Sequence, residues 1–558
     1  MSRNFSVNTI VRGTIFLKKL KRIEKSLFGD RHLNENHLFE REIKGLIKAA
    51  PYMYFTLKKD CEKSSGTGNG EGFPLLGAEI CSLEKINDKT VSELVYALSQ
   101  TYYIGEEELN SLIWQAKLCI VFKAAEEREK AELYLKKMYS VKELDENAFE
   151  ELSPLHRAFL FDKVYVNSSR ETRKEYRAKT ALISRLTGIE ERQYTSEITK
   201  RAVVDELHIG QVIEEDYRNI YPFINSSLYV RTQLWTAFIL SLAIGFFTKL
   251  WLIPIIFIPL EGIVKTASDL IVSRFARPRP LPRTKIGDEL PEEGLTLCVM
   301  SVLIADNEGL KDALLKLKTA KLKNPAKGIF FALLCDLAPT DSETTESDEE
   351  LFAEGERLKN LLFPECRIIF RKRTYSETMR KYQGFDRKRG AVEETIKYLC
   401  NEEADFYRVC GDISSLRACR FIVALDLDTI PLMDSIKELV AIALHPLNKD
   451  YGIIAPRCTS TLDSTLKTPF ACAMAGNGGV SCVSAYDSFG GEFYFDLFGE
   501  GIFCGKGLIR KEKFFKDCCD KFPPERVLSH DILEGGLTGT AYAGDVEFSD
   551  SFPPSSKA

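Results

Sequence analysis

The pattern of apolar and polar residues divides the chain into three parts. Through residues 1–225, segments such as "EREIKGLIKAA" and "TVSELVYALSQTY" carry apolar residues at three- and four-residue spacing, with charged residues between them. This spacing is typical of amphipathic helices, so we expect a helical N-terminal domain over 1–225. The glycine-rich "SSGTGNGEG" at 64–72 follows no predicted strand and lacks the Lys-Ser/Thr of a phosphate loop. A flexible connector is therefore its simpler interpretation.

The second part, 226–285, is strongly apolar. Residues 234–260 contain a single charge, Lys249, and about 20 apolar residues suffice for one bilayer crossing. Because a charge at mid-bilayer is costly, a transmembrane hairpin with Lys249 near its turn fits better than a single span. The second arm would then include three residues that are four apart and can pair on one helical face: Glu261, Lys265 and Asp269. A buried hairpin of a soluble protein is the alternative.

Basic residues and cysteines both favour a cytosolic setting for the flanking domains. Four arginines follow the hairpin within the proline-rich "RFARPRPLPR", at 274, 277, 279 and 283. By the positive-inside rule this flank is cytoplasmic, and a hairpin places both flanks on the same side. The 15 cysteines form no CxxC pair and no zinc-type spacing. Free thiols in a reducing compartment are therefore expected rather than a disulfide framework.

The third part, 286–558, alternates strand-like and helix-like segments. "LTLCVMSVLIA", "GIFFALLCD", "CRIIFRKR" and "RFIVALDLD" are strand-like, and "NEGLKDALLKLKTAKL" and "GAVEETIKYLC" are helical. This alternation predicts an α/β domain with a mainly parallel sheet, whose ligands lie at the carboxyl ends of the strands. The net charge of −5 and the isoelectric point of about 5.9 argue against a general nucleic-acid binder, so no nucleic-acid partner is expected.

Carboxylates end two of the predicted strands. Asp336 closes "FFALLCD", and Asp426 with Asp428 closes "FIVALDLD". In an extended chain, side chains two residues apart point the same way, so the two acids of the second strand repel each other unless a positive group lies between them. Mg²⁺ or Mn²⁺, which binds carboxylates together with phosphate oxygens, is a suitable group. Asp-x-Asp also occurs in ordinary turns and helix caps.

Other motifs add to this chemistry. Lys388, Arg389 and Gly390 precede a predicted helix, where a diphosphate is well received, although most of the nine basic residues in 367–389 are expected to be ordinary solvated surface. The glycines of "FGEGIFCGKG" allow close approach of a bulky ligand. In "SHDILEGG", Asp531 could accept a proton from a hydroxyl group; as the alternative, it is a helix N-cap.

Taken in order, these motifs resemble a known enzyme family. Asp336, "RKRGAVEE", the Asp-x-Asp, "FGEGIFCGKG" and "SHD" follow one another as in inverting GT-A glycosyltransferases of the cellulose-synthase type. "SETMRKYQGFDRKRG", "HPLNKDYGIIAPR" and "RVLSHDILEGG" are more similar still to the glycosyltransferase domain of cyclic β-1,2-glucan synthases. Upstream, "EGFPLLGAEI" and "DELHIGQ" resemble the region that precedes the membrane helices of that family, so the resemblance covers nearly the whole chain.

The resemblance implies a fold, a reaction and roles for individual residues. It implies a Rossmann-like GT-A domain over 286–558, in which an acceptor 2-hydroxyl attacks C1 of UDP-glucose and inverts α to β, with Mg²⁺ or Mn²⁺ as cofactor. On the donor side, the resemblance implies that Asp336 contacts the uridine, that Lys388 and Arg389 lie near the diphosphate, that Asp426 positions the sugar nucleotide and contributes to the metal site, and that Asp428 binds the metal. On the acceptor side, it implies that Phe503, Cys504 and Gly505 border the acceptor and that His530 contacts substrate. Asp531 is implied to be the general base. The implied partners are UDP-glucose, a growing glucan and membrane lipid, at the cytoplasmic face of a bacterial inner membrane.

Departures from the family pattern lead to further expectations. The family continues with an Arg/Gln-x-x-Arg-Trp segment that caps the acceptor, with more membrane helices and with a phosphorylase-like domain, none of which is found in this sequence. We therefore expect the front part of a larger synthase, incomplete at the C-terminus of its GT-A domain and with little turnover by itself, whose phosphorylase-like domain is missing or on a separate chain. A catalytically incompetent scaffold that needs a second polypeptide, and a synthase of a different β-glucan, remain the alternatives.

Overall fold

The computed structural model describes residues 128–130, 133, 150, 153–404, 406–474, 492–523, 525–527 and 530–555. The predicted helices of 1–127 and the connector at 64–72 lie outside these residues. The chain forms two compact units, 1–166 with 173–220 and 167–172 with 221–558. The division into domains at 225 and 285 stays a prediction.

The first unit is helical in its described part. After a 3-10 turn at Arg128–Lys130, its elements are α9 (Pro154–Phe159), α10 (Lys163–Asn167), α11 (Arg170–Thr187), α12 (Glu191–Val204) and α13 (Ile209–Ile220). Ser153 caps α9 by accepting a hydrogen bond from the amide of His156 at 3.3 Å. The Glu150 carboxylate is buried and accepts hydrogen bonds from Arg173 and Arg177. This buried charge is therefore fully paired, as an interior carboxylate requires.

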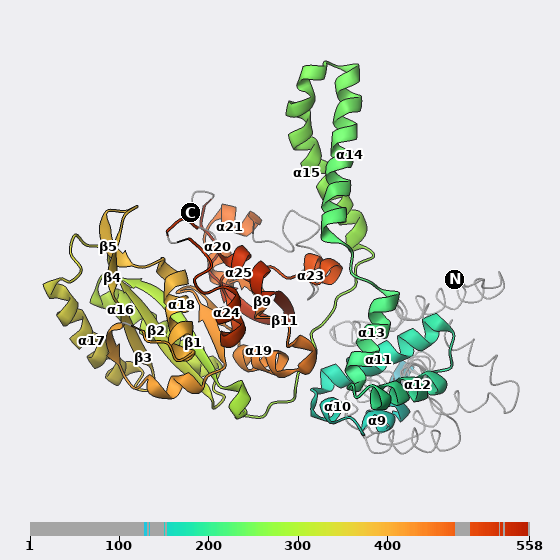
Figure 1. The fold of residues 1–558 in the computed structure, drawn as a ribbon, viewed down its shortest axis with the longest axis horizontal. Helices are drawn as coiled ribbons and strands as arrows, with labels where there is room; N and C mark the ends of the chain where they lie inside the picture. Colours follow the sequence, from blue (N-terminus) through green and yellow to red (C-terminus); the bar gives the residue numbers. More distant parts are fainter. Residues whose placement is uncertain are drawn as a thin grey trace, which may run out of the picture. The chain divides into compact units, whose positions relative to one another are not determined.

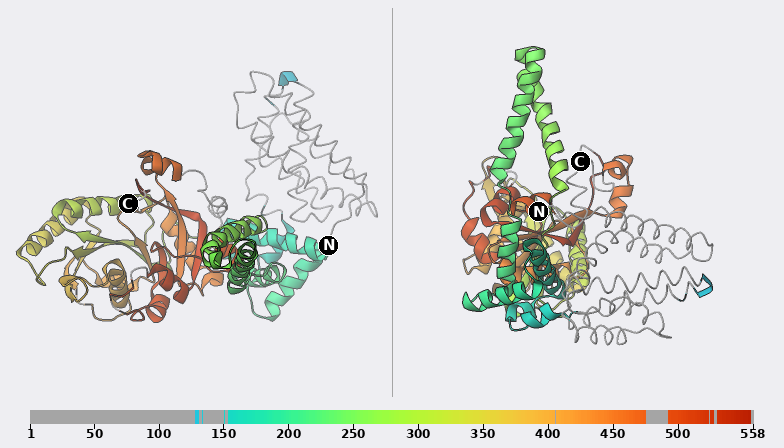
Figure 2. Two further views of the ribbon diagram at one scale, coloured as in Figure 1. Left: turned by 90° about the horizontal axis from the view of Figure 1, so that it is seen from above. Right: turned by 90° about the vertical axis from the view of Figure 1, so that its right-hand side faces the viewer.

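The apolar segment forms two long antiparallel helices, α14 (Ser226–Phe247) and α15 (Ile253–Ser273), which stand away from the α/β part of the same unit (Figures 1 and 2). By length and composition, both are apolar enough to cross a membrane. Lys249 lies in the link between them, as predicted. Their large apolar side chains are mostly exposed, among them Trp235, Ile239, Phe246, Phe247, Ile255, Ile258, Ile263 and Ile271. This exposure is the opposite of what a hairpin buried in a soluble core would show.

Asp269 joins the two helices near the base of the hairpin. Its carboxylate is buried and accepts hydrogen bonds from Tyr229 at 2.7 Å and Gln233 at 3.4 Å, both on α14. Lys265 forms the predicted i,i+4 ion pair with it at 3.4 Å, whereas Glu261 has no ion pair among the described residues. Of the two predicted pairs, Lys265–Asp269 therefore forms, and Glu261–Lys265 does not form among the described residues.

A short helix, α23 (Phe493–Phe498), packs against this base. Tyr494 receives a hydrogen bond from the Lys265 ammonium at 3.0 Å. Asp496 accepts a hydrogen bond from the backbone amide of Arg279 at 2.7 Å, and the Arg279 guanidinium stacks on Phe223. Arg279 is thus engaged within the protein, so its weight in the positive-inside argument is smaller than the sequence indicated.

The predicted α/β domain is confirmed. Its main sheet has nine strands in the order β6-β3-β2-β1-β7-β10-β9-β11-β8. β3, β2, β1 and β7 are mutually parallel, as are β9 and β11, while β6, β10 and β8 run antiparallel to their neighbours. The strands are β1 (Thr296–Ile304), β2 (Ile329–Leu337), β3 (Arg367–Arg371), β6 (Phe406–Cys410), β7 (Phe421–Leu425), β8 (Ile430–Pro431), β9 (Ile453–Ser460), β10 (Gly507–Arg510) and β11 (Thr540–Asp550); β4 (Arg373–Ser376) and β5 (Lys381–Gly384) form a separate ribbon.

Helices cover both faces of this sheet (Figure 1). Along β1, Cys298, Met300 and Val302 pack on one side with α16 (Asn307–Lys323), α17 (Glu346–Leu362) and α19 (Ser435–Leu444). Leu297 and Val299 pack on the other side with α18 (Arg387–Leu399) and α24 (Lys511–Asp517). Burial on both faces explains why these strands are continuous apolar runs. The remaining helices are α20 (Leu462–Leu466), α21 (Pro469–Met474) and α25 (Asp531–Thr538).

Candidate active site

Asp336 lies at the carboxyl end of β2 and is buried. Its carboxylate forms an ion pair with Arg371 at 2.6 Å. Burial raises the pKa of Asp336 above its ordinary value, and the charge and hydrogen bond of Arg371 oppose that rise. A Cβ on Gly384 would come within 2.2 Å of the Asp336 carboxylate, so only glycine allows this close approach. In the described residues, Asp336 is thus held by Arg371, and its predicted contact with uridine stays a prediction.

Asp426 follows the last residue of β7, and a turn closes behind it through the Thr429 amide, which donates to the Asp426 carbonyl at 3.1 Å. Its two carboxylate oxygens face two different ammonium groups. One accepts a hydrogen bond from Lys388, and the other lies 3.4 Å from Lys506. The positive groups beside Asp426 are therefore two lysines that come from segments more than 100 residues apart.

Lys388 is in the first turn of α18, which begins at Arg387 and so starts earlier than the sequence predicted. The turn before it is tight, because a Cβ on Gly390 would lie 1.9 Å from the carbonyl oxygen of Phe385. This geometry brings the Lys388 ammonium to Asp426 and also to the Gly505 carbonyl, at 2.7 Å. The "KRG" motif thus carries a lysine to the edge of the sheet where β7 ends.

Lys506 is a site residue that the sequence analysis missed, although it lies within the quoted "FCGKG". It pairs with Asp550 at the end of β11 as well as with Asp426. Burial lowers its pKa, but the hydrogen bond to Asp550 and the charges of Asp550 and Asp426 outweigh burial and hold the pKa of Lys506 above its ordinary value. Lys506 therefore stays protonated at neutral pH. A lysine inside a glycine-rich loop at the end of strands would have been the signal for it.

Asp428 is exposed, and its carboxylate has no hydrogen bond or ion pair within the part of the chain that the structure describes. This carboxylate is open to a cation, whereas both oxygens of Asp426 face ammonium groups. Mg²⁺ and Mn²⁺ are commonly bound by one or two carboxylates plus phosphate oxygens. The residues therefore fit a divalent cation held chiefly by Asp428, with Asp426 contributing only if a lysine moves.

Gly505 connects the lysine side of the site with Asp531. Its φ is +77°, a left-handed conformation that favours glycine, and a Cβ there would lie 2.9 Å from the Asp531 carboxylate. Since its carbonyl oxygen accepts the hydrogen bond from Lys388, one residue touches both groups. Lys388 and Asp531 therefore both lie beside Gly505, and Lys388 connects Gly505 with Asp426.

Asp531 begins α25 and lies beside His530 and Glu534. The His530 Nδ1 atom is 3.3 Å from the Asp531 carboxylate and 3.2 Å from that of Glu534, and the three side chains are close enough to share a metal ion. The guanidinium of Arg389 lies 4.0 Å from Glu534 and also near Asp386 and Glu393. This buried cation disfavours a second cation at Glu534.

Arg389 and Phe503 are buried, unlike the adjacent predicted site residues Lys388 and Cys504. Arg389 is buried among those carboxylates and stacks on Phe522, and it forms no ion pair with Asp426 in the described residues. Phe503 is buried and packs on the face of the sheet that α18 and α24 cover. The adjacent Cys504 is exposed. Because both side chains are buried within the protein, Arg389 and Phe503 are placed to hold neighbouring parts of the site in position. Their contacts with substrate stay predictions.

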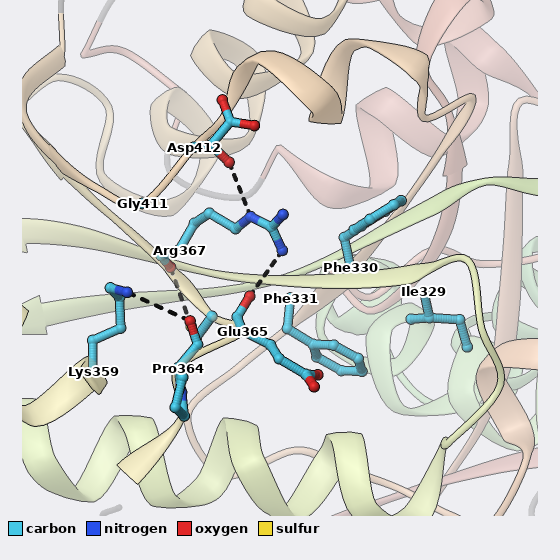
Figure 3. A pocket seen from close by; sticks show the side chains of 10 residues that line it. Ile329, Phe330, Phe331, Lys359, Pro364, Glu365, Arg367, Gly411 and Asp412 are labelled. Carbon is cyan, nitrogen blue, oxygen red and sulfur yellow. Dashed lines mark hydrogen bonds between the residues drawn. The ribbon is translucent and has the colours of Figure 1, made fainter. Parts of the chain in front are cut away.

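A cavity of about 440 Å³ lies at the opposite edge of the sheet, where β2 and β3 begin (Figure 3). Its polar side chains are engaged with backbone oxygens: Lys359 donates to Pro364, and Arg367 donates to Glu365 and Asp412. Because Asp336 and Asp426 end parallel strands at the other edge, this cavity is not part of the candidate site.

Comparison with known proteins agrees with the resemblance seen in the motifs. No family model matches the chain. Over 308 residues, 51% of this chain, it is 28% identical to the cyclic β-(1,2)-glucan synthase NdvB of Rhizobium meliloti (strain 1021), and the match spans 11% of the length of that relative. The resemblance to cyclic β-1,2-glucan synthases is thus confirmed.

Solved structures of the galactosyltransferase LgtC also match. One, in complex with donor and acceptor sugar analogues, covers 44% of this chain and 72% of its own at 15% identity and a TM-score of 0.20. Another, an active-site variant of LgtC, has the same coverage and a TM-score of 0.21. Scores this low carry no argument about the site.

Proposed function

We propose that the α/β domain is an inverting glycosyltransferase that takes glucose from UDP-glucose and adds it to a β-1,2-glucan. The observation that carries the proposal is the placement of Gly505 between Lys388 and Asp531. This placement supports a site in which the lysine binds a diphosphate and the carboxylate acts as base, at the carboxyl ends of the strands where α/β proteins bind ligands. The sequence similarity to a glucan synthase supports the same class of reaction.

The donor half of the site consists of positive groups beside Asp426 and the open carboxylate of Asp428. The Lys388 and Lys506 ammonium groups would exchange part of their contact with Asp426 for the diphosphate of the donor, since charge-assisted hydrogen bonds to phosphate are strong. A divalent cation bound at Asp428 would supply further positive charge to the departing diphosphate. Asp426, between the two lysines, would keep them in place while the donor is absent.

The acceptor half of the site is Asp531. A hydroxyl of the acceptor held beside it would attack C1 of glucose while the bond from C1 to the diphosphate oxygen breaks. The hydroxyl proton passes to the Asp531 carboxylate, and UDP carries away the bonding electron pair. Direct displacement from the face opposite the leaving group inverts α to β. Gly505, which has no side chain, leaves room between base and donor.

We also propose that α14 and α15 anchor the protein in a membrane, with the α/β domain in the cytoplasm. The exposed apolar side chains along both helices support this placement, as does the charged Lys249 in the link between them. A hairpin returns the chain to the side from which it entered. Membrane lipid is then a partner of the protein, and the glucan grows close to the bilayer.

Calorimetry with UDP and Mn²⁺ tests the donor half. We expect metal-dependent binding that is lost with EDTA and in Asp428→Ala, and that is kept in Asp312→Ala, where the carboxylate lies on the exposed part of α16. Asp531→Asn should keep binding yet lose release of UDP from UDP-glucose by about 10²-fold or more. Metal-independent binding of equal strength would overturn the donor site. Binding without turnover in the unaltered chain agrees both with the incomplete synthase expected from the sequence and with the scaffold alternative, and turnover that appears on extension of the chain would favour the first.

A further inference from the structure

Two exposed thiols face each other beside the candidate site. Cys458 lies on β9 and Cys504 lies in the loop before β10, and their sulfur atoms are 3.8 Å apart. β9 and β10 pair antiparallel, with Leu508 opposite Ile454 and Ile509 opposite Ile453. Cys504 precedes β10, which begins at Gly507, so the sulfur–sulfur contact itself places this loop beside the end of β9.

Such a placement suits a covalent bond. Gly507 supports the close approach of the two segments, because a Cβ there would lie 2.6 Å from the carbonyl oxygen of Ile454. The sulfur atoms need to approach by less than 2 Å or so to reach the length of a disulfide, about 2.05 Å.

The surroundings distinguish this pair from most other cysteines of the described chain. Cys298, Cys335 and Cys366 are buried, and burial raises their pKa values, which leaves them unreactive. At Cys504, the hydrogen bond from Cys458 and the charge of Lys506 outweigh burial and lower the pKa to about 7. The same hydrogen bond, with burial, raises the pKa of Cys458. Since either sulfur can donate to the other, one thiol of the pair can stabilise the thiolate of its neighbour.

We propose that Cys504 and Cys458 are a modification site, at which a peroxide converts the two thiols to a disulfide that lowers activity at the adjoining site. The Cys504 thiolate attacks one peroxide oxygen, the oxygen–oxygen bond breaks, and Cys504 becomes a sulfenic acid while water or an alcohol leaves. The Cys458 sulfur then displaces the hydroxyl of the sulfenic acid as a second water. Two thiols and one hydrogen peroxide thus give one disulfide and two waters, and a dithiol reductant reverses the change.

The consequence for activity rests on the proposed function and follows from Gly505. This residue is bonded directly to Cys504, accepts the hydrogen bond from Lys388 and lies against Asp531. Drawing Cys504 toward β9 therefore shifts the carbonyl that orients Lys388 and the backbone that spaces Asp531. Displacements of about 1 Å can cost about 10²-fold in rate, so we expect at least about a tenfold loss.

The experiment treats the full chain in detergent with a small excess of hydrogen peroxide and maps its peptides under non-reducing conditions. We expect a linked peptide that contains Cys458 and Cys504, absent after dithiothreitol and absent in Cys458→Ser. Cys472→Ser, which removes another exposed thiol, should form the same link. UDP release should fall with the link and recover with dithiothreitol, whereas in Cys458→Ser peroxide can take Cys504 only to the sulfenic acid and no link should form.

The outcomes separate the two claims. The absence of a linked peptide in the unaltered chain overturns the modification site. A quantitative link with unchanged UDP release overturns its effect on activity. If the reduced chain neither binds UDP nor releases it, the proposed function fails, and peptide mapping alone then decides whether the thiols form the bond.

Discussion

The ammonium group of Lys388 lies between the carboxylate of Asp426 and the carbonyl oxygen of Gly505, and it donates a hydrogen bond to each. A single side chain thus connects the end of β7 with the loop before β10. In the proposed reaction it would also contact the diphosphate of the donor, so the position of one lysine affects three parts of the site.

Replacing Lys388 tests this relationship. In Lys388→Met, Asp426 keeps only Lys506, and the donor loses a charge-assisted hydrogen bond of about 1.5–3 kcal/mol. We expect the affinity for UDP to fall by roughly 10- to 100-fold, measured by calorimetry. Lys316→Met, which removes an exposed lysine of α16, should bind as the unaltered chain does. Unchanged affinity in Lys388→Met would remove this residue from the donor site.

Two adjacent glycines of α25 predict opposite effects on stability. A Cβ on Gly535 would lie 2.8 Å from Thr540 and 2.9 Å from Phe503, whereas a Cβ on Gly536 would meet nothing within 4 Å. We expect Gly535→Ala to lower the free energy of unfolding by about 1–3 kcal/mol through overpacking. Gly536→Ala should be neutral or raise it by up to about 1 kcal/mol, because alanine favours helix. Urea unfolding compares the two, and equal effects would contradict the packing described around α25.

The placement of the hairpin predicts the sidedness of labelling. In spheroplasts, a membrane-impermeant maleimide added outside should label Lys249→Cys, since that residue lies in the link between α14 and α15. The exposed Cys458 and Cys472 of the α/β domain should react only after lysis. Labelling of Cys472 in intact spheroplasts would place the α/β domain outside and refute the proposed orientation.

The ion pairs of Glu150 lead us to expect that the folded protein loses stability in acid. Burial by itself would raise its pKa, but the hydrogen bonds and charges of Arg173 and Arg177 lower the pKa to about 2, from an ordinary value of 4.5. A depressed carboxyl pKa stabilises the folded state above the unfolded pKa, and that contribution is lost as pH falls from about 4.5 toward 2. The full contribution is on the order of 3 kcal/mol.

Unfolding by urea, followed by circular dichroism at pH 6 and at pH 3, measures this effect. Glu150→Gln should be less stable than the unaltered chain at pH 6, and the difference should narrow at pH 3. Glu129→Gln, in the 3-10 turn at 128–130, serves as the control and should show no such difference at either pH. A pH-independent difference for Glu150→Gln would mean that its effect is not due to the titration of this carboxylate.

Local patterns predicted the elements of the α/β domain well. The apolar runs before Asp336 and Asp426 form β2 and β7, and both acids end their strands as expected. Periodicity cannot show which strand lies beside which, so the antiparallel β10 between β7 and β9 was not foreseen. That insertion is what brings Lys506 to Asp426, a contact that depends on residues far apart in sequence.

The ion pairs within the site also depend on contacts that a sequence pattern does not reveal. The sequence suggested a cation beside the two acids, and the structure places Lys388 and Lys506 beside Asp426 while leaving Asp428 open. Arg389 follows Lys388 directly, yet it points in a different direction from α18 and packs among carboxylates. Adjacent residues of a helix point about 100° apart, so a motif alone does not say which of two neighbouring cations meets the ligand.

If the hairpin lies in a membrane as proposed, the docking of α23 on its base connects the bilayer with the loop that carries Gly505. The amide of Ile224, just before α14, donates to the carbonyl of Leu497 in α23 at 2.8 Å, and the left-handed Gly499 that ends α23 rests on the ring of Phe223. Only a few residues separate Gly499 from Cys504. A thinner or thicker bilayer changes the tilt of such a hairpin. A change in tilt would move α23 and, through the few residues that follow it, the loop that carries Gly505. On the proposed membrane placement and function, turnover in nanodiscs should therefore vary with acyl-chain length.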